Sequence, residues 1–257
     1  MLLAGCARAK PTPTPTPTPT LTPAVAAGEA LMDPLRAMTL PRQALPGGLV
    51  LQAADFTTNQ EAASDDPQGT EAALANFQRW GRLLGYRVRY ASEEAFGVFR
   101  TGGLLAIVTR AVQHRDQAGA QEAFRHWERR LQDPTYLKAR LTTRPGTTFN
   151  RFQPLPVAPI GDKSLAVDAI LSIPAPEGTA LFITRFYLFQ QGPIMGLLEL
   201  FYVREPAHLG ELEGLAVSFH SRVLAGLGQS QKGVVYSPFT RPALNLKEFS
   251  VRHAQVR

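Results

Sequence analysis

The spacing of apolar residues along the chain predicts alternating helices and strands. Residues 86–90 alternate strictly between apolar and basic side chains, which is typical of a strand with one solvated face. After the Asp66-Pro67 start signal, apolar residues recur at helical spacing up to Gly85, so a helix is expected between these points. The apolar positions of that helix are Ala73, Leu74, Phe77, Trp80 and Leu84.

Turn signals and apolar runs place the remaining elements. The further strands are expected at residues 96–100, 104–112, 164–173, 181–189 and 194–203, with an edge strand beginning at Leu49. Glycine-containing turns predict two hairpins. One joins the strands at 96–100 and 104–112, and the other joins the strands at 181–189 and 194–203. The further helices are expected at residues 28–38, 116–131 and 205–228.

These elements predict an α+β fold, with a mainly antiparallel sheet and packed helices, because local hairpins dominate. Three strands followed by a helix occur twice, which favours two duplicated βββα halves. The expected divisions are a partial lipoprotein signal at 1–6, a linker and lead-in at 7–44, an α+β domain at 45–228 with halves at about 45–140 and 155–228, and a C-terminal extension at 229–257.

The two strands at 181–189 and 194–203 are apolar at almost every position. An antiparallel sheet with one solvated face would alternate instead, so both faces of these strands are expected to be covered. Helices on both sides, a partner subunit or an apolar ligand would each provide such cover. The helices predicted above favour the first alternative.

Arg185 interrupts one of these apolar strands. A buried guanidinium needs a negatively charged partner, and Glu199 on the neighbouring strand is the expected one if Arg185 is structural. The alternative is that Arg185 holds the anionic group of a ligand. An anionic amphiphile would suit such a site, because its tail buries apolar area while its headgroup pairs with Arg185.

The N-terminus carries the one cysteine of the chain, in Leu3-Ala4-Gly5-Cys6. These four residues resemble the bacterial lipobox, in which a signal peptidase cuts before the cysteine and the thiol receives a diacylglycerol. The resemblance implies an extracytoplasmic protein that is attached to a bacterial membrane through lipidated Cys6. Since a signal peptide needs a basic region and an apolar region before this point, we expect the true start to lie upstream, or Met1 to be internal to the signal.

A repeat of proline and threonine follows the cysteine, from Pro11 to Pro19. Proline fixes φ, removes a backbone donor and pushes the preceding residue toward extended geometry. The residues from Pro11 to Pro23 therefore predict a polyproline II spacer of about 40 Å. Residues 24–44 are expected to be a loose lead-in, with little packed structure before residue 40.

Composition excludes several classes of protein. With one cysteine, the chain has no intramolecular disulfide and no cysteine zinc cluster. The formal net charge of +6 comes mainly from scattered arginines without a nucleic-acid-binding motif, so no nucleic acid partner is expected. No apolar run reaches the roughly 18 residues that cross a bilayer.

Catalytic motifs are also missing from the sequence. There is no GxSxG, P-loop, dinucleotide fingerprint, HExxH or EF-hand loop. His208 and Glu211 are three residues apart, but no third metal ligand follows at a suitable spacing. We therefore predict no catalytic residue, no metal site, no cofactor and no enzymatic activity.

A turn at residues 161–164, Gly-Asp-Lys-Ser, leads into strands, an apolar hairpin and a closing helix. This order over residues 161–228 is similar to sensor-like PsbP/Mog1-type domains of bacterial lipoproteins. The resemblance implies a mostly non-catalytic domain, which agrees with a lipoprotein that binds a ligand or a protein partner. The alternative is a cell-envelope hydrolase whose site has no recognisable motif.

Overall fold

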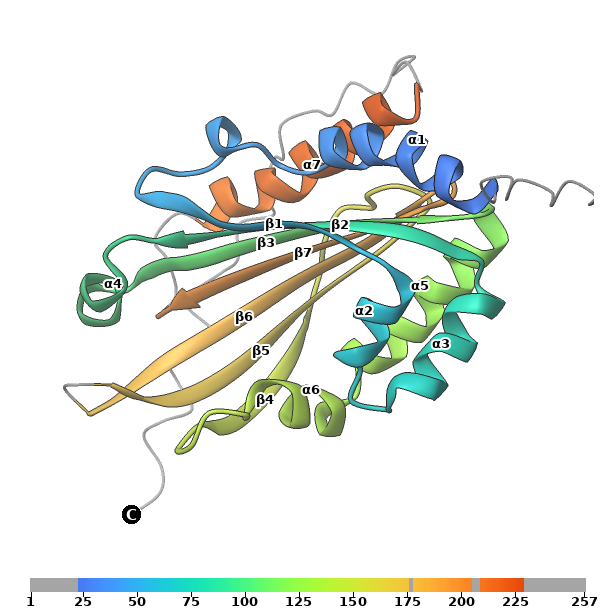
Figure 1. Ribbon diagram of the computed structural model, residues 1–257. Coiled ribbons are helices and arrows are strands. Elements are labelled where there is room, and N and C mark those ends of the chain that lie inside the picture. Colours follow the sequence, from blue (N-terminus) through green and yellow to red (C-terminus); the bar gives the residue numbers. More distant parts are fainter. Residues whose placement is uncertain (1–22, 176–177, 205–208, 229–257) are drawn as a thin grey trace, which may run out of the picture.

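The computed structural model describes residues 23–175, 178–204 and 209–228, which form a seven-stranded antiparallel sheet between two layers of helices (Figure 1). The α+β class predicted from the sequence is confirmed. The strands are β1 (Leu49–Thr57), β2 (Arg82–Ser92), β3 (Gly103–His114), β4 (Thr148–Leu155), β5 (Lys163–Ala175), β6 (Gly178–Gln191) and β7 (Ile194–Val203), in the spatial order β1-β2-β3-β7-β6-β5-β4. The helices are α1 (Pro23–Met38), α2 (Asn59–Ser64), α3 (Thr70–Arg79), α4 (Ala95–Thr101), α5 (Gln117–Leu131), α6 (Pro134–Leu141) and α7 (Leu209–Gly226), with a 3₁₀ turn at Arg42–Ala44.

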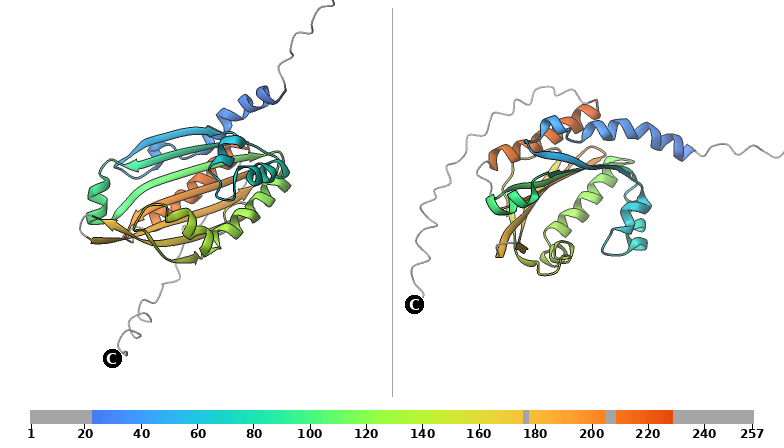
Figure 2. Two further views of the ribbon diagram at one scale, coloured as in Figure 1. Left: turned by 60° about the horizontal axis from the view of Figure 1, so that its bottom comes forward. Right: turned by 60° about the vertical axis from the view of Figure 1, so that its left-hand side comes forward.

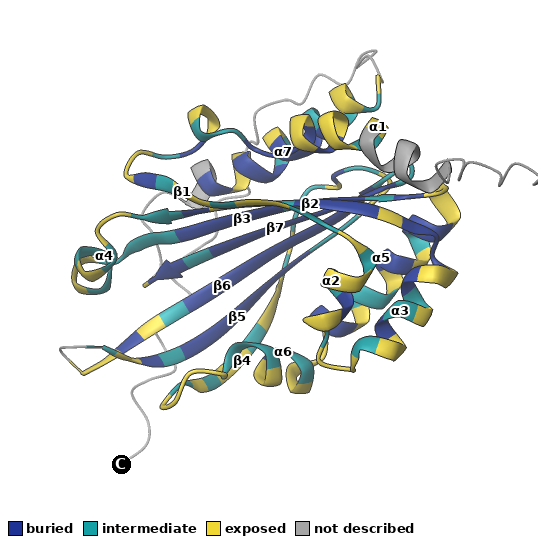
Figure 3. Ribbon diagram, in the orientation of Figure 1, coloured by how far each residue is buried: buried dark blue, intermediate teal, exposed yellow. Residues whose placement is uncertain are grey.

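Helices cover both faces of the sheet, as the apolar strands predict. Alternate residues of β6 point to opposite sides, so that Tyr187 and Phe189 pack with α1 and α7. Phe186 and Leu188 pack on the other side, with α2, α3, α5 and α6. Figure 2 shows the two layers from other directions, and Figure 3 shows the buried central strands between them.

Three consecutive strands and a helix occur once, as β5-β6-β7-α7, whereas the first half runs β1-α2-α3-β2-α4-β3-α5, with α4 at the position of a predicted strand. The two groups of strands join through the antiparallel pair β3 and β7 at the centre of one continuous sheet. The two closing helices, however, pack on opposite faces. The two halves therefore differ both in the order of their elements and in the face of the sheet that the closing helix covers.

Two of the expected elements differ in the structure. The helix expected between Asp66 and Gly85 is limited to α3, because Asp66 forms a turn with Gln68 N (2.9 Å) and Gly81 turns the chain into β2 at a φ of 59°. The expected strand at 96–100 is wrong, because these residues lie in α4. Both neighbouring positions of β2 are already filled by β1 and β3, so the sheet has no place there for another strand.

Three further elements, the short helix α2, helix α6 and strand β4, were not expected from the sequence. Helix α6 follows Asp133-Pro134, and the Asp133 carboxylate accepts a hydrogen bond from Thr135 N (2.8 Å). This Asp-Pro pair is the same start signal that marks residues 66 and 67. Strand β4 lies at the edge of the sheet beside β5, and five of its eight residues are exposed, so it has no apolar run by which to recognise it.

The lead-in expected to be loose is instead packed on the domain. Leu35 and Met38 of α1 and the following Leu40 are each no more than 2% exposed, against α7 and the sheet. The expectation of little packed structure before residue 40 is therefore wrong for these residues. Several predicted features lie outside the described residues: Cys6, the Pro-Thr repeat, the first residues of the helix expected at 205–228, and the C-terminal extension at 229–257. Within the described ranges, no helix is both long and apolar enough to cross a bilayer.

Candidate functional site

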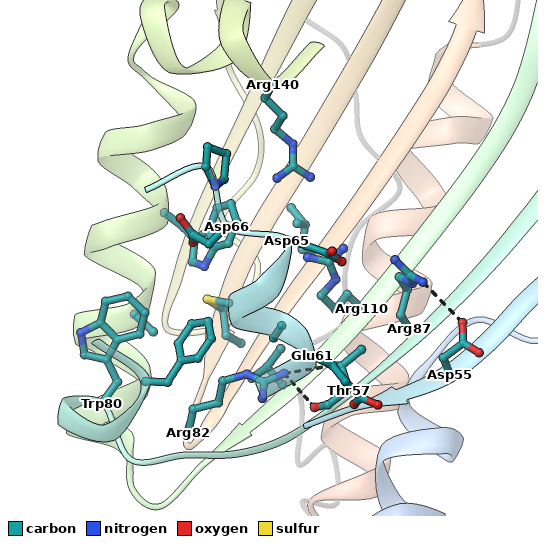
Figure 4. A pocket seen from close by; sticks show the side chains of 18 of the residues that line it. Asp55, Thr57, Glu61, Asp65, Asp66, Trp80, Arg82, Arg87, Arg110 and Arg140 are labelled. Carbon is teal, nitrogen blue, oxygen red and sulfur yellow. Dashed lines mark hydrogen bonds and ion pairs between the residues drawn. The ribbon is translucent and has the colours of Figure 1, made fainter. Parts of the chain in front are cut away.

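A cavity of about 850 Å³ lies between the sheet and the layer of α2, α3, α5 and α6 (Figure 4). We call this cavity the arginine pocket. Strands β1, β2, β3 and β7 supply its floor, and the helices and the loop after α2 supply its walls. Its lining arginines are Arg82, Arg87, Arg110 and Arg140.

The register of the sheet places charged residues in one row across the floor. Asp55 of β1 stands opposite Arg87 of β2, Arg87 stands opposite Arg110 of β3, and Arg110 stands opposite Leu197 of β7. Directly opposite residues on one face of an antiparallel pair have Cβ atoms about 5 Å apart, and like charges in such positions repel. Arg87 and Arg110 are therefore a like-charge pair that the strand register holds together.

These two arginines differ in their partners. Arg87 Nη2 lies 3.4 Å from Asp55 Oδ2, and both side chains are more than a third exposed. The half-buried Arg110 makes no hydrogen bond or ion pair with any other residue that the structure describes. Burial lowers the pKa of Arg110, and the charge of Glu199 opposes this change. Arg110 therefore keeps its full donor capacity toward the pocket.

Arg82 lies at one end of the pocket and is only 7% exposed. Its Nη1 donates to Asn59 Oδ1 (2.6 Å), and its Nη2 donates to the Thr57 carbonyl (3.0 Å) and to Thr57 Oγ1 (2.9 Å). The guanidinium lies in the space above Gly85, where a Cβ atom would come within 2.7 Å of Arg82 Nη2. Burial lowers the pKa of Arg82 to about 10, and no carboxylate of the described ranges forms an ion pair with it.

Arg140 of α6 borders the pocket on another side. Its Nη2 donates to Glu199 Oε1 (2.8 Å), and Glu199 is only 4% exposed. Burial is the largest single effect and disfavours the charged guanidinium of Arg140, but the charges of Glu199 and Tyr136 and the hydrogen bonds to both residues together outweigh it and raise the pKa of Arg140. This pair connects α6 to the centre of the sheet.

Aromatic and aliphatic side chains supply the rest of the lining. Phe77 and Trp80 are buried at the wall near α3, whereas Trp127 and Tyr136 are half-buried. The Trp127 and Tyr136 rings contact each other edge to face, with centroids 6.5 Å apart. The floor adds apolar area from Val112, Met195 and Leu197. The pocket therefore combines an apolar wall with a basic floor.

Two of the three carboxylates of the pocket wall have structural partners. Asp66 receives two hydrogen bonds from Arg130, of 2.8 and 2.9 Å, with both side chains less than 10% exposed. Glu61 Oε2 accepts from Thr58 N and Thr58 Oγ1, both at 2.8 Å, in the capping box of α2. Asp65 is exposed. In the part of the chain that the structure describes, no three His, Cys, Asp or Glu side chains gather to hold a metal ion.

His114 is buried beside Arg82, and burial lowers the pKa of His114 to about 4, with the charge of Arg82 acting in the same direction. An unfolded histidine titrates near 6.5, so between pH 6.5 and 4 the unfolded chain binds a proton that the folded chain does not. Acidification through this range should therefore reduce stability, by about 2–3 kcal/mol from His114 alone. Urea unfolding of the parent and of His114→Gln at pH 7.5 and 4.5 measures this contribution. An equal loss in both proteins would contradict it.

The predicted site residue Arg185 lies on the opposite face of the sheet from this pocket. Its Nε and Nη2 donate to the two oxygens of Asp168, both at 2.7 Å, and its guanidinium lies over the Tyr202 ring. The expected partner, Glu199, is wrong, because Glu199 points to the other face and binds Arg140. Burial is the largest single effect and opposes the charge of Arg185, but the hydrogen bonds to Asp168 and the charge of Asp168 together with nearby tyrosines outweigh it and raise the pKa of Arg185 above the usual range. Cys6, which is predicted to carry the lipid, lies outside the described residues.

The sequence reasoning did not identify Arg110. Residues 104–112 form an apolar strand that one arginine interrupts, which is the same signal that identified Arg185. Applied to the strands at 104–112 and 181–189, this signal finds Arg110 and Arg185, which lie on opposite faces of the sheet. The row that joins Arg110 to Arg87 depends on the pairing of β2 with β3, and it becomes visible only with the register.

The sequence matches no protein-family model and no curated protein. Among solved structures, the fold is similar to the extracellular domain of PknH from Mycobacterium tuberculosis, with a TM-score of 0.39 and 7% sequence identity. This match covers 77% of the present chain and 96% of that domain. The resemblance of residues 161–228 to sensor-like lipoprotein domains stays a prediction. At this level of similarity no role is transferred to the residues of the arginine pocket, and its geometry stands by itself.

Proposed function

We propose that this chain is a lipid-anchored extracytoplasmic protein of a bacterial membrane, whose domain binds an anionic amphiphile in the arginine pocket without transforming it. One observation carries this proposal. Arg110 lies half-buried on the floor of a cavity of about 850 Å³ and has no hydrogen-bond or ion-pair partner among the described residues.

A bound anion would satisfy this arginine. Removing a cation from water without a partner is unfavourable, and a hydrogen-bonded anion offsets part of that cost. The apolar wall of the pocket would bury the remainder of the ligand, as in most small-molecule sites. The size of the cavity suits a drug-sized molecule rather than a single ion.

The distribution of titratable groups supports binding over hydrolysis. A hydrolase needs a nucleophile or an activated water beside a general base. Here Asp66 and Glu61 are hydrogen-bonded to Arg130 and to the start of α2, and Asp55 is paired with Arg87. The pocket floor instead presents arginines, which bind anions but transfer no proton near neutral pH.

A binding experiment with decanoate tests this function. Decanoate should quench or shift the tryptophan fluorescence of the parent protein, because Trp80 and Trp127 line the pocket. Replacement of Arg110 by methionine should weaken binding by about 10–100-fold, the effect of losing one charge-assisted hydrogen bond.

Arg89→Met is the matched control for this experiment. Arg89 lies on the same strand and face as Arg87 but is exposed and outside the pocket lining, so its replacement should leave the affinity unchanged. Equal decanoate affinity of the parent and Arg110→Met would contradict the proposal, and so would an absence of binding by decanoate and by the other alkyl probes used below.

The anchor is tested separately. Lipobox chemistry requires the thiol, so Cys6→Ser should move the protein from the membrane fraction to the soluble fraction of cells that express the gene with its complete signal peptide. Thr12→Ser is the matched control, because it leaves the thiol intact and should therefore leave the protein in the membrane fraction. Unchanged membrane partitioning of Cys6→Ser would exclude lipidation at this residue.

A further inference from the structure

We propose that the charged group of the ligand is a phosphoryl group with two negative charges, held by Arg87 and Arg110 on the floor of the arginine pocket. This inference rests on the proposed function and names the chemical class of its ligand. It starts from the one row of the sheet that carries Asp55, Arg87 and Arg110.

The register fixes two guanidinium groups beside each other. Arg87 and Arg110 stand directly opposite on neighbouring strands, an arrangement that disfavours folding when both are charged and nothing lies between them. Asp55, the neighbour on the outer side, reaches only Arg87, at 3.4 Å. An anion that binds both arginines would convert this repulsion into two attractive contacts.

Positive and negative side chains are unevenly distributed between the floor and the wall of the pocket. Four arginines line the cavity, and two of them form ion pairs, Arg87 with Asp55 and Arg140 with Glu199. Arg82 and Arg110 form no ion pair with any carboxylate that the structure describes. Glu61 acts on Arg82 only at longer range, since its Oε2 is hydrogen-bonded to Thr58. The two unpaired arginines belong to the floor strands, whereas the two lining carboxylates without an ion pair among the described residues, Glu61 and Asp65, lie on the wall. Positive charge is therefore in excess on the floor, where an anion with two negative charges would neutralise more of it than a monoanion would.

The type of cation favours phosphate as well. All of the lining cations are arginines, whose planar forks match phosphate and carboxylate oxygens with paired hydrogen bonds. A carboxylate has two oxygens and one charge, which one guanidinium satisfies. A phosphate monoester has three terminal oxygens, so it can accept from Arg87 and Arg110 together.

The source of the phosphoryl group is a separate question, because inorganic phosphate and an amphiphilic phosphate monoester share this chemistry. Met195 and Leu197 beside the row, and the half-buried Trp127 and Tyr136, favour an attached apolar group. The experiment therefore contains one probe for each source.

Isothermal titration calorimetry of the purified protein at pH 8.0 would compare decyl phosphate, decyl sulfate, decanoate and inorganic phosphate. The alkyl probes are used below their micelle concentrations. At this pH a phosphate monoester is a dianion, since its second pKa is about 6, whereas decyl sulfate and decanoate are monoanions with the same tail. Decyl phosphate should bind at least about tenfold more tightly than either monoanion, the effect of one additional charge-assisted contact.

Two variants test whether Arg87 and Arg110 cause the preference for decyl phosphate. Arg87→Met and Arg110→Met should each bring the affinities of the three alkyl probes to within about threefold of one another, and Arg89→Met should keep the preference of the parent. Circular dichroism melting curves establish that each variant is folded. If Arg110→Met does not fold, Arg110→Lys replaces it in the experiment. Lysine keeps the positive charge but lacks the planar guanidinium, so this variant should reduce the preference for decyl phosphate.

The outcomes separate the two proposals. Equal affinity for the three alkyl probes, with dependence on Arg110, would overturn the phosphoryl assignment and leave the proposed function standing. Inorganic phosphate that binds as tightly as decyl phosphate would support the assignment and remove the amphiphile from the proposed function. A preference for decyl phosphate that survives in Arg110→Met would overturn the assignment, and an absence of binding by all four probes would overturn both.

Discussion

Replacement of Arg185 by methionine is expected to reduce the free energy of unfolding by about 3–5 kcal/mol, the usual cost of breaking a buried ion pair on one side. The change leaves the Asp168 carboxylate, which is 6% exposed, without the two hydrogen bonds of 2.7 Å that now satisfy it. Urea unfolding at pH 7 would measure the loss. Decanoate binding should be unchanged in any folded fraction, because Arg185 lies on the other face of the sheet.

The matched control is the double variant Arg185→Met with Asp168→Leu. Replacement of a whole buried ion pair by apolar residues is often neutral, so the double variant should recover most of the stability that the single variant loses. A single variant within about 1 kcal/mol of the parent would contradict a structural role for the pair. Loss of amphiphile binding together with retained stability would instead support Arg185 as the ligand residue expected from the sequence.

The second large effect is expected for Trp80→Ala, at about 3–5 kcal/mol of stability, the range for truncation of a buried aromatic residue. Trp80 is 3% exposed, ends α3 and packs against Phe77 and His126 at centroid distances of 5.9 and 4.8 Å. Its truncation removes contacts that hold α3 to α5. Thermal and urea unfolding of the variant would measure the cost.

Trp127→Ala is the comparison, because the helical pattern of the sequence also places Trp127 on an apolar stripe. In the structure its side chain is only half-buried, at the wall of the pocket, so it should lose less stability than Trp80→Ala and should weaken decanoate binding. Equal losses of stability in the two variants would mean that Trp127 belongs to the core rather than to the ligand wall.

Local patterns in the sequence were sufficient for much of the fold. Strict alternation identified β2, the apolar runs identified β3, β6 and β7, and helical spacing identified α5. Residues 96–100 were misassigned because their apolar residues are compatible with a strand, and only the filled sheet positions on both sides of β2 exclude it. Edge strand β4 has little buried surface and hence little signal.

The site was less accessible to sequence reasoning, for a physical reason. Burial and polarity identify an unusual arginine, but the partner of that arginine depends on which strands are neighbours. Arg185 was correctly expected to need a carboxylate, yet β5 and β7 both flank β6, and Asp168 rather than Glu199 shares the face of Arg185. Arg87 appears in sequence as the solvated side of an alternating strand, although it lies in the same row as Arg110.

The packing of α1 on α7 has a practical consequence for experiments on this protein. Both helices lie on the face of the sheet that is turned away from the arginine pocket, and they connect directly to the two ends of the described domain (Figures 1 and 2). A biotin or sensor-chip linkage made at the first turn of α1 or the last turn of α7 would therefore be attached on the side away from the cavity. Immobilised protein should in consequence keep its ligand-accessible face toward the solution, which makes surface-based screening of candidate molecules feasible.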